Sequence, residues 1–178
     1  MSKLFYIVGP SGAGKDSLIE YCREQLNGVL PVIFTHRYIT RPAKTGSENH
    51  VSLSTEEFKL RIKHELFALY WESHGLYYGI GIEINSWLEK GFSVVINGSR
   101  EYLPVALEKY PDLQPILIEA DSEIIKSRLN NRGREDEKSI AERIARNEEF
   151  SLSALQIHRI QNNGTIAAAA SELLNTIY

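Results

Sequence analysis

The chain has 178 residues, a length that suits one domain with a sizeable core. Its formal net charge of −3 gives no general reason to expect a nucleic-acid partner, and no stretch approaches the roughly 20 apolar residues that span a bilayer. The single cysteine, Cys22, excludes an internal disulfide and fits a cytoplasmic, reducing location.

The N-terminal part of the chain predicts alternating strands and helices. Residues 3–8 form a short apolar run that stops at Gly-Pro, which indicates a buried strand. A helix is expected at residues 15–27, because apolar side chains recur there at helical spacing. Residues 31–36 predict a second strand, and a polar, basic loop follows at 39–49.

The middle of the chain opens with a capping box, in which Ser54 is followed three residues later by Glu57, so a helix is expected there. Residues 66–81 are aromatic and rich in glycine, which favours short strands and turns. A short helix is predicted at 82–91 and a buried strand at 92–97.

The C-terminal part predicts a strand at 115–120, helices at 121–133 and 139–150, a last strand at 158–162 and a final helix at 165–177. Apolar strands that alternate with helices imply a mostly parallel sheet covered on both faces. In such a sheet ligands bind beyond the carboxyl ends of the strands.

A glycine loop follows the first predicted strand, and its sequence GPSGAGK fits the P-loop pattern G-x-x-x-x-G-K between a strand and a helix. The glycines let backbone N–H groups curl around phosphate oxygens, and the lysine reaches the β- and γ-phosphates. The residues expected to bind ATP are Gly9, Pro10, Ser11, Gly12, Ala13, Gly14, Lys15, Asp16 and Ser17.

The position after Lys15 departs from the pattern, because Asp16 stands where serine or threonine is usual. Mg²⁺ is often held by one or two carboxylates together with substrate phosphates, and in many P-loop enzymes one carboxylate comes from the end of another strand. Here that strand, 92–97, ends in Asn97 and carries no acid. We expect Asp16 to supply the metal carboxylate; the alternative is that it only caps the helix.

Four segments in this order make nearly the whole chain resemble the guanylate-kinase branch of the nucleoside-monophosphate kinases: GPSGAGKDSL, YITRPAKTGSE, GLYYG and RLNNRGREDEKSIAERI. The resemblance implies an α/β P-loop fold of the nucleoside-monophosphate-kinase type, with a mostly parallel sheet flanked by helices. It also implies one domain over 1–178, with a core at about 1–36, 92–125 and 155–178, a small acceptor-binding lobe at about 37–91 and an arginine-rich lid at about 128–147.

The same resemblance implies roles for individual residues, since members of that family hold the acceptor phosphate with a T-R-x-x-R loop and a Y-Y-G segment. Carried over by motif and spacing, the implied substrate-binding residues are Arg37, Arg41, Lys44, His50, Tyr78 and Asn97. The implied catalytic residues are Lys15 and the lid arginines Arg132, Arg134 and Arg143.

Several positions differ from guanylate kinases. By spacing, Leu69 replaces the glutamate that reads guanine, Lys44 replaces an arginine of the acceptor loop, and His50 stands where a phosphate-binding tyrosine is expected. The strand aspartates are lost around Asn97. The sequence therefore predicts a surviving acceptor-phosphate site beside a lost base-reading site.

The set GPSGAGKDSL, HRYITR, GSENH, GLYYG and NGSR looks like the ribose 1,5-bisphosphate phosphokinase family, which has been tied to phosphonate utilisation. The resemblance implies transfer of the γ-phosphoryl group of ATP, with Mg²⁺, to the 1-phosphate of a sugar bisphosphate. The product is 5-phosphoribosyl 1-diphosphate. A small sugar phosphate is thus the expected partner, and neither a nucleic acid nor a membrane is expected.

Two alternatives stay open from the sequence. The first is a nucleotide kinase of guanylate-kinase type, against which Leu69 argues. The second is a guanylate-kinase-like module that only binds proteins, against which the intact Gly14-Lys15 pair and the arginine-rich stretch argue. An acceptor phosphate is already anionic near neutral pH, so catalysis needs positioning and charge neutralisation rather than a general base.

Overall fold

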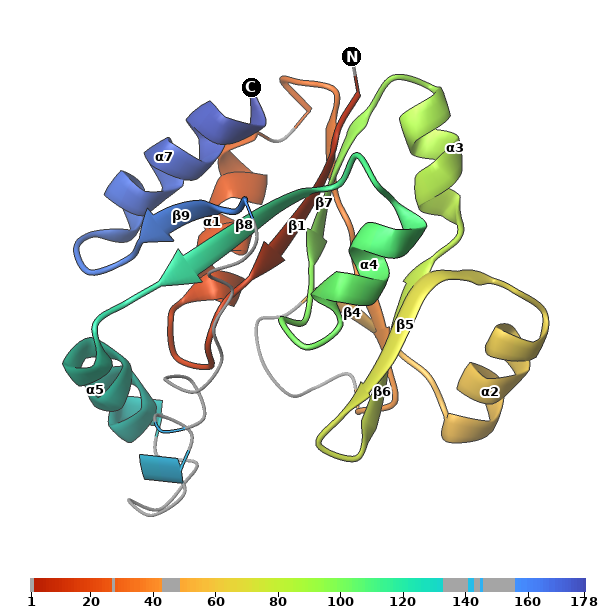
Figure 1. Ribbon diagram of the computed structural model, residues 1–178, viewed down its shortest axis with the longest axis horizontal. Helices are drawn as coiled ribbons and strands as arrows, with labels where there is room; N and C mark the ends of the chain where they lie inside the picture. Colours follow the sequence, from red (N-terminus) through yellow and green to blue (C-terminus); the bar gives the residue numbers. More distant parts are fainter. Residues whose placement is uncertain (1, 27, 43–48, 133–140, 143–144, 146–155) are drawn as a thin grey trace.

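The structure is a computed structural model that describes residues 2–26, 28–42, 49–132, 141–142, 145 and 156–178. A five-stranded sheet forms its centre (Figure 1). The strands lie in the order β2 (Val32–Phe34), β7 (Ser93–Asn97), β1 (Leu4–Val8), β8 (Gln114–Glu119) and β9 (His158–Gln161). Every neighbouring pair in this sheet is parallel, which confirms the predicted fold class.

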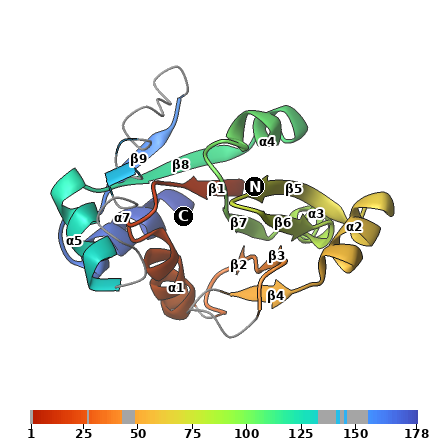
Figure 2. The ribbon, with the colours of Figure 1, turned by 90° about the horizontal axis from the view of Figure 1, so that it is seen from below.

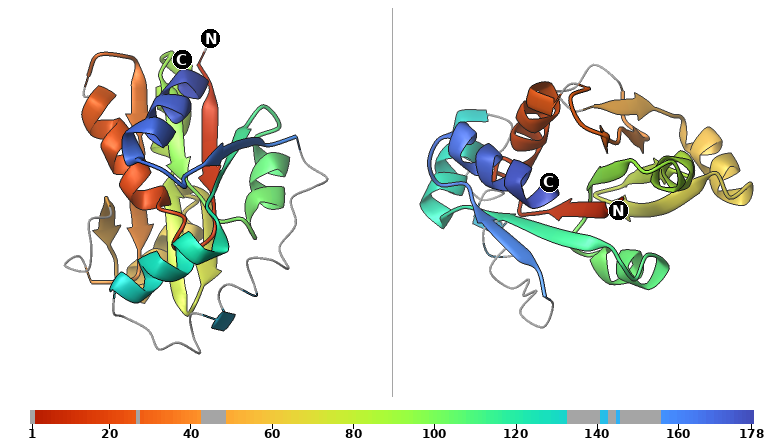
Figure 3. Two further views of the ribbon diagram at one scale, coloured as in Figure 1. Left: turned by 90° about the vertical axis from the view of Figure 1, so that its left-hand side faces the viewer. Right: turned by 90° about the horizontal axis from the view of Figure 1, so that it is seen from above.

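Helices cover both faces of the sheet, as the alternating pattern predicts (Figures 2 and 3). The side chains of β1 show why, because all five residues of this strand are buried. Phe5 and Ile7 pack in the core formed with α1 (Lys15–Leu26) and α7 (Ile166–Ile177). Tyr6 and its even-numbered neighbours face the opposite core, which contains residues of α3 (Glu83–Glu89) and α4 (Leu103–Lys109).

A second sheet of four strands extends the core on the α3 and α4 side. Its order is β4 (His50–Ser52), β3 (Arg37–Ile39), β6 (Leu76–Gly81) and β5 (Phe67–Ser73), and α2 (Thr55–Lys63) joins β4 to β5. The Ser54 side chain accepts a hydrogen bond from the Glu57 backbone N–H, which confirms the predicted start of α2. The strands predicted within 66–81 are confirmed as β5 and β6.

The sequence did not predict β3, β4 or α4. The two strands have three residues each, too few for a clear alternation of apolar and polar side chains. Helix α4 begins after Tyr102, whose side chain makes no capping hydrogen bond, and it carries a proline in its first turn. The usual serine, threonine, aspartate or asparagine signal for a helix start is therefore missing there.

Helix α5 (Ser122–Arg132) follows β8 and matches the helix predicted at 121–133. The helix predicted at 139–150 lies outside the described residues except for 141, 142 and 145. Figure 1 places α5 and the β5–β6 hairpin on opposite sides of the loop that joins β1 to α1, at the carboxyl ends of the parallel strands. Among the described residues, no helix has the length and apolar character needed to cross a membrane.

Candidate active site

The loop between β1 and α1 has a backbone that only glycine adopts easily. Gly12 and Gly14 have φ angles of +89° and +85°, in the left-handed region. A Cβ on Gly14 would also lie 2.5 Å from Asn162 Nδ2, so a larger residue would displace that side chain. The loop leads directly into α1, and the first helical residue is Lys15. This is the geometry in which backbone N–H groups hold phosphate.

Two side chains from the C-terminal half brace this loop from behind. Asn162 Nδ2 donates to the Ala13 carbonyl at 2.7 Å, and Arg128 Nη1 donates to the same oxygen at 3.1 Å. Arg128 Nη2 also donates to the Asn162 carbonyl at 2.8 Å. Asn162 is only 4% exposed and its backbone N–H bonds to Glu119. The loop is thereby fixed to the ends of β8 and β9 and to α5.

Lys15 and Asp16 form a close pair at the start of α1. Lys15 Nζ lies 3.7 Å from Asp16 Oδ1, and the lysine side chain is 15% exposed. Burial lowers the pKa of Lys15, the Asp16 carboxylate opposes that shift, and Arg37 and Arg100 add to it. A polyphosphate in the loop would supply the negative charge that favours the protonated lysine.

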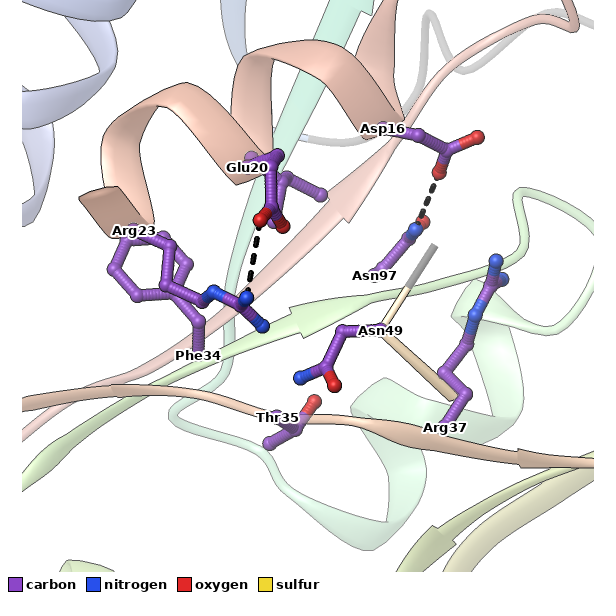
Figure 4. A pocket seen from close by; sticks show the side chains of 9 residues that line it. Asp16, Glu20, Arg23, Phe34, Thr35, Arg37, Asn49 and Asn97 are labelled. Atoms are coloured by element: carbon purple, nitrogen blue, oxygen red, sulfur yellow. Dashed lines mark hydrogen bonds and ion pairs between the residues drawn. The ribbon is translucent and has the colours of Figure 1, made fainter. Parts of the chain in front are cut away.

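Asp16 also contacts the end of β7, which is the strand that lacks an acid. Asn97 Nδ2 donates to Asp16 Oδ1 at 2.6 Å. Asn97 is 8% exposed, whereas the Asp16 side chain is 38% exposed. The structure therefore puts the P-loop acid and the strand amide side by side, and part of the Asp16 carboxylate faces outward (Figure 4).

Arg37 on β3 is a buried cation at the same place. It is 9% exposed, and its guanidinium lies 5.3 Å from the centre of the Tyr78 ring. Tyr78 in turn stacks on Trp71, with ring centroids 5.7 Å apart and an interplanar angle of 4°. Burial lowers the pKa of Arg37, and Asp16 is the largest opposing influence. The face of the Tyr78 ring attracts the Arg37 guanidinium and so favours this position of the side chain.

Further cationic side chains surround this point. Arg41 influences both Arg37 and His50 electrostatically, so the three side chains are neighbours. Burial, reinforced by Arg41, lowers the pKa of His50 and favours its neutral form. Arg100, just beyond β7, is close enough to Lys15 to influence its charge. Arg37, Arg41, Arg100 and Lys15 form a convergent group of positive charge next to Asp16.

A pocket opens between α1 and the strands β2, β3 and β7 (Figure 4). Its lining combines charged and amide side chains with a smaller apolar part. The lining residues are Asp16, Ile19, Glu20, Arg23, Phe34, Thr35, Arg37, Asn49 and Asn97. The pocket adjoins the phosphate loop through Asp16 and the acceptor lobe through Arg37, so it lies where a donor and an acceptor would meet.

The predicted site residues fall into three groups in the structure. All nine residues predicted to bind ATP lie in the β1–α1 loop and the first turn of α1. A second group lies beside Asp16, joined by the contacts and electrostatic interactions described above: Arg37, Arg41, His50, Tyr78 and Asn97. Lys44, Arg134 and Arg143 lie outside the described residues, and Arg132 is the last residue of α5.

Sequence reasoning underestimated the residues that brace the site. Arg128 begins the arginine-rich segment RLNNRGREDEKSIAERI but is not among the predicted lid residues, and in the structure it holds the phosphate loop through the Ala13 carbonyl. Asn162 and Tyr6 were not singled out at all. The Tyr6 hydroxyl accepts from the Ser99 N–H at 3.0 Å, and a Cβ on Gly98 would collide with its ring. No local pattern signals these contacts, because they join residues far apart in the chain.

The donor set suits Mg²⁺ only in combination with a nucleotide. Among the described residues, no group of three or more histidine, cysteine, aspartate or glutamate side chains could enclose a metal ion. Mg²⁺ commonly takes one or two carboxylates and completes its shell with phosphate oxygens and water. The partly exposed Asp16 carboxylate, next to the phosphate loop, fits that requirement.

Comparison with known proteins agrees with this geometry. A family model described as guanylate kinase matches residues 1–176. A protein named ribose 1,5-bisphosphate phosphokinase PhnN from Desulfomicrobium baculatum is 51% identical over 99% of this chain and 95% of its own length. A protein of the same name from Thiobacillus denitrificans is 50% identical over 98% of this chain and 92% of its own length.

Among solved structures, the guanylate kinase of Anaplasma phagocytophilum matches with a TM-score of 0.73. The match covers 99% of this chain and 84% of that protein, at 18% sequence identity. At this identity the likeness shows the fold and leaves the acceptor open.

Proposed function

This chain belongs to the guanylate kinase family and, within it, to the ribose 1,5-bisphosphate phosphokinases, and we propose that it transfers the γ-phosphoryl group of ATP to ribose 1,5-bisphosphate. The acceptor group is the 1-phosphate, and the products are 5-phosphoribosyl 1-diphosphate and ADP. The observation that carries this proposal is the convergence of Arg37, Arg41 and Arg100 next to Lys15, with no base-reading acid at Leu69.

Leu69 supports the choice of acceptor. It is fully buried, at 0% exposure, and packs in the apolar core shared by β5, β6 and the central sheet. A leucine there offers no hydrogen bond to a purine edge. An acceptor with two phosphates, by contrast, needs several cations, and the charged side chains of β3 and its following loop provide them.

The reaction requires little covalent chemistry from the protein. An oxygen of the acceptor 1-phosphate attacks the γ-phosphorus of ATP, and the bond between that phosphorus and the bridging oxygen of ADP breaks, with the electron pair leaving on ADP. The acceptor oxygen is already ionised, so no base must remove a proton. The protein's contribution is to align two anions that repel one another.

We assign the cations to this task as follows. Lys15 contacts the β- and γ-phosphates at the start of α1, where the helix N-terminus adds positive potential. Arg37 and Arg41 hold the acceptor phosphates from the second sheet. Arg132, Arg134 and Arg143 remain the predicted lid residues that neutralise charge on the transferred group. Lys44, His50 and Tyr78 remain predicted acceptor contacts.

Asp16 is the residue we assign to Mg²⁺. When bound, the metal would neutralise charge on the nucleotide phosphates and hold their geometry. The chain's own contribution is to fix the carboxylate, because Asn97 Nδ2 and Lys15 Nζ both contact its Oδ1.

The test is to identify the product. The purified protein is incubated with ATP, Mg²⁺ and ribose 1,5-bisphosphate, and the mixture is followed by phosphorus NMR. Formation of a second pair of coupled diphosphate signals, distinct from the α- and β-phosphorus pair of ADP and with the 5-phosphate signal of the sugar retained, would support the proposal. Ribose 5-phosphate serves as the control acceptor, because it lacks the 1-phosphate. ADP release without this second pair of coupled signals would refute the proposed transfer.

A further inference from the structure

The side-chain amide of Asn97 has two polar atoms. The nitrogen, Nδ2, is bonded to Asp16, whereas the proposed chemistry gives no role to the oxygen, Oδ1. Asn97 Nδ2 lies 2.6 Å from Asp16 Oδ1. An ionised carboxylate accepts hydrogen bonds and donates none, so the amide nitrogen must face Asp16. The amide oxygen, Oδ1, is therefore held on the other side of the same planar group.

This oxygen is buried, and within the described part of the chain no donor reaches it. Asn97 as a whole is 8% exposed and lines the pocket between α1 and the strands, together with Asp16, Thr35 and Arg37 (Figure 4). Buried polar atoms of this kind almost always have a partner in the functional state. The partner expected at Asn97 Oδ1 is a hydrogen-bond donor from a ligand in the pocket.

The chemistry of the acceptor narrows the choice. A carbonyl oxygen of an amide cannot bond to an ionised phosphate oxygen, because both are acceptors. The phosphates must therefore be held by Arg37, Arg41 and their neighbours, and a different part of the acceptor must face Asn97. The donors that a ribose bisphosphate offers are its hydroxyl groups.

We propose that Asn97 Oδ1 accepts a hydrogen bond from the 2-hydroxyl of the ribose acceptor and thereby selects a ribose over a deoxyribose. This inference rests on the proposed function. The 2-hydroxyl is favoured because it is next to the carbon that carries the reacting phosphate, and Asn97 is tied to Asp16, the neighbour of Lys15, at the transfer end of the site. The 3-hydroxyl lies one carbon further from that phosphate.

The amide also explains why the strand has no acid here. An aspartate at position 97 would place a second carboxylate against Asp16, where the two negative charges would repel one another. An asparagine at this place can bond to Asp16 through its nitrogen and still offer an acceptor oxygen to the pocket. Orientation of the sugar thus depends on the same residue that positions the metal-binding acid.

The experiment measures kcat/KM for three acceptors: ribose 1,5-bisphosphate and its 2-deoxy and 3-deoxy analogues. They are tested with the parent protein, with Asn97→Ala and with Thr35→Val. Thr35 lines the same pocket, but its hydroxyl donates to the Val95 carbonyl at 3.3 Å, so it is the matched control. The ratio of kcat/KM for two acceptors does not depend on the fraction of the protein that is folded. The comparison therefore holds even if a variant is less stable.

The parent protein is expected to prefer the ribose acceptor over its 2-deoxy analogue by roughly 10- to 100-fold. Asn97→Ala should bring this preference close to equality, and Thr35→Val should keep it. An Asn97→Ala variant that keeps the parent's preference overturns the inference, as does a variant that loses only its discrimination against the 3-deoxy analogue.

Two further outcomes also decide the question. If Asn97→Ala raises the Mg²⁺ requirement and leaves the ribose preference unchanged, the amide serves a metal-bound water and the inference is wrong. If the parent protein turns over none of the three acceptors, the proposed function itself fails, and the inference fails with it. Turnover by the parent protein therefore separates the two failures.

Discussion

The donor and acceptor sides of this site are held in different ways. On the donor side, backbone groups of the β1–α1 loop would face the nucleotide, and Asn162 and Arg128 fix the loop through one carbonyl oxygen. On the acceptor side, side chains from β3, β6 and β7 meet at Arg37, which is stacked on aromatic rings. A backbone cradle suits any nucleoside triphosphate, whereas a side-chain site can change its acceptor by substitution.

The largest effect is expected from removing the charge of Lys15. Lys15→Met should lower kcat by roughly 10²- to 10³-fold, because a positioned donor to the transferred group is lost. The melting temperature without nucleotide should change little or rise, since a buried charge is removed. Steady-state rates and thermal unfolding measure both quantities. Lys109→Met, far from the loop, is the control; equal losses in the two variants would contradict the account.

Arg41→Gln should separate the acceptor side from the donor side. We expect the KM for the acceptor to rise by roughly 10- to 100-fold, because a charge-assisted bond to phosphate is lost, while ATP affinity stays within about twofold. Kinetics with each substrate varied in turn and calorimetry with an ATP analogue measure this split. Arg159→Gln, at a surface ion pair with Glu119, should behave like the parent. A comparable loss of ATP affinity in Arg41→Gln would break the comparison.

Asp16→Asn keeps the size of the side chain and removes only its charge. We expect about a tenfold or greater rise in the Mg²⁺ concentration that gives half-maximal rate, because one carboxylate of the metal shell is lost. The hydrogen bond to Asn97 can persist between two amides, so stability should hardly change. A Mg²⁺ titration that superimposes on that of the parent would assign Asp16 to helix capping alone.

Asn162→Leu tests the hydrogen bond that holds the phosphate loop through the Ala13 carbonyl. The Ala13 carbonyl would retain only its bond from Arg128, and a buried polar contact would be lost, at a cost of about 1–3 kcal/mol. We expect a lower free energy of unfolding and a several-fold weaker affinity for ATP. The KM for the acceptor should be nearly unchanged. Chemical denaturation and calorimetry give these values, and a variant with weaker acceptor binding alone would contradict the assignment.

The smallest effect concerns pH. Burial and Arg41 lower the pKa of His50 in the folded protein. Between that lowered pKa and about 6.5, the unfolded chain binds a proton that the folded chain does not, so stability falls as the pH falls through this window. His50→Gln should reduce the drop in melting temperature between about pH 7.5 and about pH 5. His64→Gln, at an exposed position, should leave the drop in melting temperature as it is. Identical plots of melting temperature against pH for all three proteins would show that His50 does not cause the drop.

The sequence predicted the donor side better than the acceptor side, for a physical reason. The glycine pattern from Gly9 to Lys15 is continuous in the chain, and its function depends on local backbone geometry that only glycine allows. The contact between Asp16 and Asn97 joins two segments that a parallel sheet brings together. A mostly parallel sheet was predicted, with ligands at the carboxyl ends of its strands, but neither the order of the strands nor the direction of the Asn97 amide was.

Local sequence patterns could not predict two sets of contacts. One is the hydrogen bonding of Asn162 and Arg128 to the phosphate loop, and the other is the packing of aromatic rings against Arg37. Asn162 follows β9 at a position without a motif. Arg128 lies within α5 and begins the segment RLNNRGREDEKSIAERI, but that motif does not indicate a contact with the phosphate loop. Tyr78 was expected as a phosphate contact, yet the structure also shows it stacked between Trp71 and Arg37. Both arrangements depend on how α5 and the second sheet pack, which local periodicity does not encode.

The acceptor side is expected to bind a sugar bisphosphate in preference to a nucleotide. One measurement tests this most directly. The kcat/KM of the parent protein is measured for ribose 1,5-bisphosphate and for GMP under identical ATP and Mg²⁺ concentrations. The account predicts a large preference for the sugar bisphosphate, because Leu69 offers nothing to a purine and the cations around Arg37 suit two phosphates. Turnover of GMP that equals or exceeds that of the sugar would contradict it.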